Sequence, residues 1–297
     1  QNSSNAPYLE TESTAAENNN QNWMASVNTN GFTTGISEHI NNNSGSAFVA
    51  WQWKANGGTT ASNTDGTITS TVQFNSDAGF SIQTFTSASS GNSNWGHGLG
   101  VTPDVFIVKR RDGTSSWWGH WKGTSRTAGS GNNWQYMPLN STAAATSLST
   151  FKADSTTITT SNDFVPNSAS MLCYAFAEKQ GYSKFSSYVG NGNANGPFIY
   201  TGFKPAFILC KNATTAGDNW EIRDNKRNDF NPQGKALYSN LSAAEYNATA
   251  IATDSLSNGF KVRATDHGLN ESGQTYIYMA FAENPFVTST GIPTTAR

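Results

Sequence analysis

The side chains that could do chemistry in this chain are few and lie far apart in the sequence. The four histidines lack the spacing of metal ligands, so no metal site is predicted and each is expected to be structural. They are His39, His97, His120 and His267. Cys173 and Cys210 lie in apolar runs far from any histidine, which disfavours a Cys/His nucleophile and predicts two buried, free thiols. Reduced thiols fit a protein that is assembled in a cytoplasm.

Paired carboxylates are the second kind of chemistry to consider, because glycosidases use two of them. Glu178 and Glu283 lie at matching ends of two similar segments, and Glu221 lies close to Asp224. This repetition argues against catalysis, since an active site seldom recurs in tandem. The turn at 224–229 could offer oxygen ligands to Ca²⁺, but its two basic residues disfavour a cation, so a solvated turn is expected. We therefore predict no enzyme activity and no cofactor.

Tryptophans are the strongest candidates for a binding function. An exposed indole can stack on a sugar ring, whereas a buried indole belongs to a core or a subunit interface, and the sequence leaves both alternatives open. Trp117 and Trp118 are adjacent, so in a strand they point to opposite faces, and at least one is expected to be available for a partner. The candidate residues for a glycan site or a subunit interface are Trp117, Trp118, Trp121, Trp134 and Trp220.

The composition indicates what must position these side chains. Of 297 residues, 13% are charged and the net charge is −2, so nucleic acid is not an expected partner. Aromatic residues make up 12%, and Gly, Ser, Thr and Asn dominate the remainder, which favours short strands and turns over helices. No apolar run approaches the roughly 20 residues of a membrane span, so membrane insertion is not expected.

Internal repeats organise the chain. A motif that begins with Asn-Gly-Phe and closes with an aromatic strand occurs at 257–283 and again at 29–53, and its closing half recurs at 167–178. Pro103 and Pro205 precede similar apolar runs, where a missing N–H costs no ladder bond at the start of a strand. The spacing of these motifs gives a period of about 103 residues, which is typical of tandem β domains.

A second recurring segment contains small residues. The stretch 8–17, with Ser-Thr-Ala-Ala near its end, has counterparts at 136–145 and 237–245. The first repeat therefore begins before the Asn-Gly-Phe motif.

The predicted fold is all-β, with tandem antiparallel β-sandwich repeats of jelly-roll-like type. Many short strand signals separated by turn residues support it. A short strand is expected within 67–74 of an otherwise loop-like stretch. The predicted organisation is a partial first repeat holding only a closing half (1–54), a linker or long loop (55–78), a middle repeat (79–182), a last repeat (183–287) and a polar tail (288–297).

The partial repeat is the least self-sufficient element. Residues 46–53 are predicted to form its aromatic closing strand, without the opening strand that the other repeats have. A half sandwich exposes strand edges and apolar faces. We expect these to be covered by another chain or by the complete repeats of the same chain.

Several strings resemble a known family. Residues 182–192, 196–207 and 276–286, with 48–54 and others upstream, are similar to an uncharacterised domain that is common in structural proteins of tailed phages, especially marine and cyanobacterial ones. The resemblance spans about residues 8–286. It implies a virion component of tail-fibre or appendage type, and it supplies no catalytic residues.

The resemblance and the repeats together lead us to expect a non-enzymatic virion structural protein. It would be a fibre, appendage or decoration that forms homo-oligomers through its repeats and contributes to host attachment. Its expected location is the virion, assembled in the host cytoplasm, and its expected partners are other copies of itself, other virion proteins and a host-surface glycan. One alternative is a carbohydrate-binding adhesin that uses exposed tryptophans, and another is a glycan-cleaving hydrolase of tailspike type.

Overall fold

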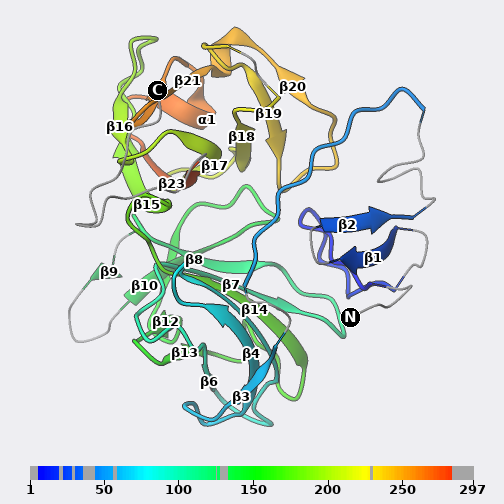
Figure 1. Cartoon of the computed structure of the whole chain (residues 1–297). Helices are drawn as coiled ribbons and strands as arrows, with labels where there is room; N and C mark the ends of the chain where they lie inside the picture. The colour runs from blue at the N-terminus through cyan, green and yellow to red at the C-terminus, as the bar shows by residue number, and fades with distance from the viewer. Residues whose placement is uncertain are drawn as a thin grey trace.

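The computed structural model describes residues 6–19, 23–28, 31–35, 44–55, 59–124, 126–127, 133–227 and 230–282. Strands make up 43% and helices 3% of it, which confirms the all-β prediction. Two β units lie one above the other, with a small hairpin beside them (Figure 1). The hairpin consists of β1 (Met24–Asn28) and β2 (Gly31–Thr34).

The middle repeat is built on one large antiparallel sheet, in the order β11-β10-β8-β7-β14-β5-β4-β3, with β9 paired to β10. A smaller sheet, β12-β13-β6, belongs to the same unit. The strands of the large sheet are β3 (Ala61–Asn63), β4 (Ser70–Asn75), β5 (Phe80–Thr86), β7 (Val105–Arg110), β8 (Trp118–Trp121), β9 (Arg126–Thr127), β10 (Asn133–Pro138), β11 (Thr146–Leu148) and β14 (Ser170–Phe176). Those of the small sheet are β6 (Ser93–Gly96), β12 (Lys152–Ala153) and β13 (Thr157–Thr160).

The last repeat has the same topology. Its large sheet runs β20-β19-β18-β17-β23-β15 and its small sheet β21-β22-β16, so each strand matches one of the middle repeat in order. The strands are β15 (Ser183–Val189), β16 (Phe198–Tyr200), β17 (Pro205–Asn212), β18 (Glu221–Asp224), β19 (Lys235–Tyr238), β20 (Tyr246–Asn247), β21 (Thr253–Leu256), β22 (Gly259–Val262) and β23 (Thr275–Ala282). A 3₁₀ turn, η1 (Thr249–Ile251), and one helical turn, α1 (His267–Asn270), complete the unit.

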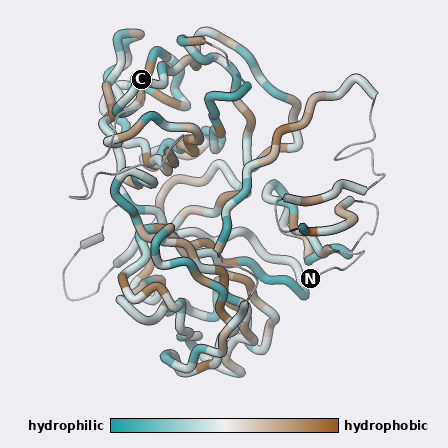
Figure 2. The backbone as a smooth tube through the Cα atoms, viewed as in Figure 1, coloured by the Kyte–Doolittle hydropathy of each residue, from teal (hydrophilic) through white to brown (hydrophobic). Residues whose placement is uncertain are grey.

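The central strands are apolar on both faces because both faces of each large sheet are covered. In β14, Met171 and Cys173 point into the core of the middle repeat, while Phe176 points the other way. The large sheets of the two repeats therefore share one hydrophobic core between them. Each repeat also has a core of its own on the other face of its large sheet. Figure 2 shows hydrophobic stretches running through the interior of both units.

The segment 55–78 is not a linker. β3 and β4 lie within it and extend the large sheet of the middle repeat, with β4 paired to β5 along its whole length. The expected strand within 67–74 corresponds to β4, and polar residues dominate around it because it lies near the sheet edge.

The predicted closing strand at 46–53 is not a strand. The segment is extended, and residues 48–54 alternate between exposed and less exposed, but no backbone ladder joins it to the described chain. Trp51 and Trp53 pack edge-on against Phe207, and Trp53 also against Phe281. The aromatic face of the partial repeat is thus covered by the last repeat of the same chain, one of the two expected outcomes.

Candidate functional site

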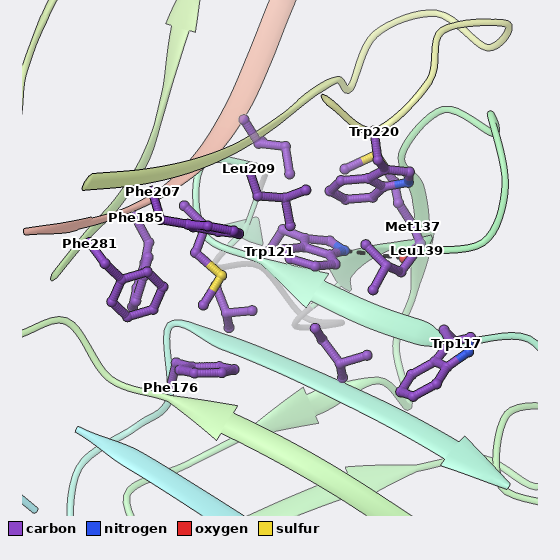
Figure 3. Close-up of a cluster of buried hydrophobic side chains, with 14 of the residues drawn as sticks. Trp117, Trp121, Met137, Leu139, Phe176, Phe185, Phe207, Leu209, Trp220 and Phe281 are labelled. Carbon is purple, nitrogen blue, oxygen red and sulfur yellow. Dashed lines mark hydrogen bonds between the residues drawn. The ribbon is translucent and has the colours of Figure 1, made fainter. Parts of the chain in front are cut away.

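The tryptophan segments lie where the two large sheets meet. Trp121 from β8 and Trp220, just before β18, approach with ring centroids 4.4 Å apart, and both are fully buried. Trp117 lies at the end of the same core (Figure 3). Phe176 of the middle repeat contacts Phe281 of the last repeat, so the shared core is aromatic along its length. These tryptophans join repeats.

The other two candidate tryptophans face the opposite side of the middle sheet. Trp134 is buried, and Trp118 is half-buried against Tyr136 and Phe164. Trp117 and Trp118 do point to opposite faces, as predicted. The expectation that one of them is available for a partner is wrong, because the sheet is covered on both sides.

A segment of the middle repeat fixes the indole of Trp220. The Trp220 N–H donates to the carbonyls of Pro138 (3.0 Å) and Ser141 (3.1 Å). Two backbone bonds continue the contact, from Gly217 N to Thr142 O (3.0 Å) and from the amide of residue 145 to the carbonyl of residue 213 (2.9 Å). Residues 136–145 thus dock the middle repeat onto the last one.

The N-terminal segment 8–17 docks onto the middle repeat in the same way. The Trp117 indole donates to Glu10 O (2.8 Å), Ser115 N donates to Thr14 O (2.9 Å), and Glu17 N donates to the carbonyl of residue 111 (2.8 Å). Each bond joins positions equivalent to those of the other joint. We call 8–17, 136–145 and 237–245 the docking segments. The acceptor is the surface that receives a docking segment, and it consists of the end of a strand and the tryptophan that follows it.

The same hydrogen bond in both complete repeats orients the tryptophan of the acceptor. The Trp117 backbone N–H donates to Asn140 Oδ1, and the Trp220 backbone N–H donates to Asn240 Oδ1, both at 2.9 Å. These asparagines were not singled out from the sequence, although both stand at the same place within a docking segment. The signal that could have found them is that shared position.

The two joints differ in charge. Arg111 holds Glu17 through two hydrogen bonds of 2.7 and 2.9 Å, whereas alanines, 145 and 213, occupy these positions in the second joint. Lys109 Nζ donates to the carbonyls of Thr14 (3.0 Å) and Ala15 (2.8 Å). The N-terminal joint is therefore held by an ion pair that the internal joint lacks.

Comparison with known proteins adds a family. Residues 3–285 match a domain of unknown function, DUF7483. The chain belongs to this family. No curated protein and no solved structure matches the chain. In the part of the DUF7483 chain that the structure describes, no helix is long and apolar enough to cross a membrane.

Glu178 of the DUF7483 chain serves as a clasp between its repeats. Its carboxylate binds Lys122 (2.8 Å) from the middle repeat and Lys184 (2.6 Å) from the last, while Glu283, the carboxylate considered with it in the sequence, lies outside the described residues. Partial burial raises the pKa of Glu178, but the hydrogen bonds and charges of the two lysines outweigh it and hold the pKa below its usual value.

We expect this clasp to make the domain sensitive to acid. A carboxylate with a lowered folded-state pKa stabilises the fold above its unfolded pKa, and this stabilisation is lost as the pH falls through the folded value. Glu178→Gln should cost about 1 kcal/mol at neutral pH, discounted because the lysines are partly exposed. Urea denaturation of both proteins should show this difference shrinking as the pH falls below the ordinary pKa of glutamate. A difference that persists in acid would contradict the assignment.

The second carboxylate pair is also committed to structure. Glu221 is buried and bonded to Arg223, and burial raises its pKa in spite of that charge. Asp224 accepts the backbone N–H of Lys226 and pairs with Arg227 (2.6 Å). The turn is therefore closed by an internal ion pair, and its residues 228–229 lie outside the described residues.

Histidines and cysteines occupy structural positions. His97 and His120 are buried and bonded to the carbonyls of Asp154 (3.2 Å) and Gln135 (2.9 Å). His39 lies outside the described residues, and His267 is bonded to aspartate 218. Among the described residues, no group of three or more His, Cys, Asp or Glu side chains could hold a metal. Both cysteines are free and buried, as predicted.

Lys211 stands at the position of Lys109, but within the described part of the chain its ammonium is bonded to its own strand, at Asn212 O (2.6 Å), and not to a docking segment. Burial lowers the pKa of Lys211 to about 8. The folded state therefore binds fewer protons than the unfolded state between about pH 8 and the ordinary lysine value, and stability rises with pH across that window. Relative to Lys211→Met, the native domain should gain about 2 kcal/mol between about pH 7 and about pH 10. Parallel urea curves at all pH values would contradict this.

Proposed function

We propose that this chain is a non-enzymatic structural component of a phage particle, a fibre, appendage or decoration that assembles through its repeats. The observation that carries the proposal is the joint. Two copies of the docking segment bind two copies of the acceptor within one chain, with equivalent backbone bonds and a buried indole at each joint. Repeats stacked in this way form a continuous body rather than beads on a linker, which suits a load-transmitting particle component. The resemblance to phage structural proteins supports the same conclusion.

The alternative functions receive less support. A glycan-binding adhesin would need an exposed indole, and the five candidate tryptophans are buried or half-buried. A hydrolase would need two free carboxylates in a cleft, and Glu178 and Glu221 are engaged by basic side chains. A depression of about 500 Å³ in the last repeat has one acid among its lining residues, Asp254, which is paired with Arg263 (2.6 Å).

The proposal is tested on particles. Antibodies raised against the purified chain should label purified particles of the phage that encodes it at one distinct structure. Quantitative mass spectrometry should find the chain in a fixed ratio to the other virion proteins. A chain that stays in the soluble fraction, while capsid and tail proteins sediment, would contradict the proposal.

A further inference from the structure

The chain holds three docking segments, and two of them are docked. The third, 237–245, begins in the last residues of β19, as the second begins in the last residues of β10. Residues 241–246 are all exposed, including Leu241 (41%) and Tyr246 (48%). The corresponding residues of the second segment, 141–145, are by contrast all half-buried.

The backbone groups that form the other two joints are left without those bonds in the third. Ser242 corresponds to Thr14 and Thr142, whose carbonyls accept a backbone N–H of the repeat that they dock onto. Glu245 corresponds to Glu17, whose N–H donates to a backbone carbonyl of that repeat. Among the described residues, no backbone bond joins the Ser242 carbonyl or the Glu245 N–H to another segment. The third segment therefore offers an unused copy of the docking surface.

Charge selects the acceptor that this segment fits. Glu17 and Glu245 share a position that is alanine in the second segment, and the residue opposite Glu17 is Arg111. In its own chain, Glu245 is held by Arg227 (2.8 Å) and, more loosely, by Lys235 (3.5 Å), at a side-chain exposure of 33%. The glutamate at the end of the third segment is therefore complementary to the acceptor that contains Arg111. It is not complementary to the acceptor of the internal joint, which has an alanine in that place.

We propose that the third docking segment of one copy binds the acceptor of Lys109, Arg111, Ser115 and Trp117 in a second copy, in place of that copy's own segment 8–17. The contact is head-to-tail, so it builds a ring or an open filament, depending on whether the rotation closes. The inference deepens the proposed assembly role. It is tested on the purified chain, so its failure is distinguishable from a failure of the particle experiment.

Segment 8–17 acts in this arrangement as an intramolecular cap. A tethered segment competes at an effective concentration on the order of millimolar, so the native chain should be mainly monomeric at micromolar concentration. Releasing the cap should expose the acceptor. Glu17→Arg does this with one change, because it places an arginine against Arg111 and close to Lys109.

The test is sedimentation equilibrium of three full-length variants beside the native chain. Glu17→Arg should self-associate with an apparent Kd at least about tenfold below that of the native chain. Glu17→Arg/Glu245→Arg should return to the native level. Glu12→Arg, which makes the same charge change in the same segment and leaves the Glu17–Arg111 pair intact, should behave as the native chain does.

A peptide assay keeps the test decisive if a variant folds poorly. A labelled peptide of residues 236–247 should bind the Glu17→Arg chain, and the same peptide with Glu245→Arg should bind at least about tenfold more weakly. No peptide binding, equal binding of the two peptides, or equal association of the single and double variants would each overturn the proposal.

Discussion

Replacing Trp220 with alanine should lower the free energy of unfolding by about 4 kcal/mol, the largest loss expected from any single change in the joint. Trp220 is fully buried between the sheets, where it contacts Trp121 and donates to two carbonyls of the second docking segment. Its removal leaves a cavity in the shared core and two acceptors without their donor. Guanidinium denaturation followed by circular dichroism measures the loss.

Two variants separate these causes. Trp220→Phe keeps much of the ring volume but cannot donate, so it should cost roughly half as much. Trp118→Ala removes a half-buried indole on the other face of the middle sheet and should cost less than Trp220→Ala. If Trp118→Ala proved the more damaging change, the shared core would not be the main link between the repeats.

Replacing Arg223 with methionine should cost about 3–5 kcal/mol at neutral pH. Arg223 is 2% exposed and supplies the guanidinium that compensates the buried carboxylate of Glu221, and it also donates to Gln233 O (3.2 Å). Without it, Glu221 becomes an uncompensated charge in the interior of the last repeat. Urea denaturation at several pH values measures the effect.

The pH dependence identifies the cause. A carboxylate whose folded pKa is raised stabilises the fold only below its unfolded pKa, and that contribution is lost as the pH rises. Arg223→Met should therefore be less harmful at about pH 5 than at about pH 7. The double change Arg223→Met/Glu221→Leu should recover most of the loss, because no charge is then buried. A double variant as unstable as the single one would show that packing, not charge, is responsible.

The repeat pattern allowed much of this architecture to be predicted from sequence. The alignment of Pro103 with Pro205 placed two equivalent strands, and β7 and β17 lie there. The docking segments were also recognisable as copies. Their role was not, because similarity shows that segments are equivalent but not what they touch.

Burial was harder to predict than the strands, because a sequence pattern does not show which other part of the chain covers a given face. Trp220 and Ile222 alternate with Glu221 and Arg223, which predicts a half-buried strand. Both faces are buried in the structure, since one faces the shared core and the other the core of the last repeat. Period-two alternation shows only that the two faces of a strand differ in polarity. Charged residues that form a buried ion pair give the same pattern as residues on a solvent-exposed face.

Local composition misled in the N-terminal part for a related reason. Residues 46–53 have the aromatic and β-branched content of a strand, but a ladder needs a neighbour, and the partial repeat supplies none among the described residues. The residues of β4 are mostly polar, yet they pair fully with β5 because a strand of an antiparallel sheet with one solvated face needs only one apolar face.

The joint should make one cooperative body of the two complete repeats. Differential scanning calorimetry of the full chain tests this most directly, by comparing the calorimetric and van't Hoff enthalpies of unfolding. We predict one transition in which the two enthalpies agree, and two transitions once Trp220→Ala has broken the shared core. Two separate transitions in the native chain, each with the enthalpy of a single repeat, would contradict the account.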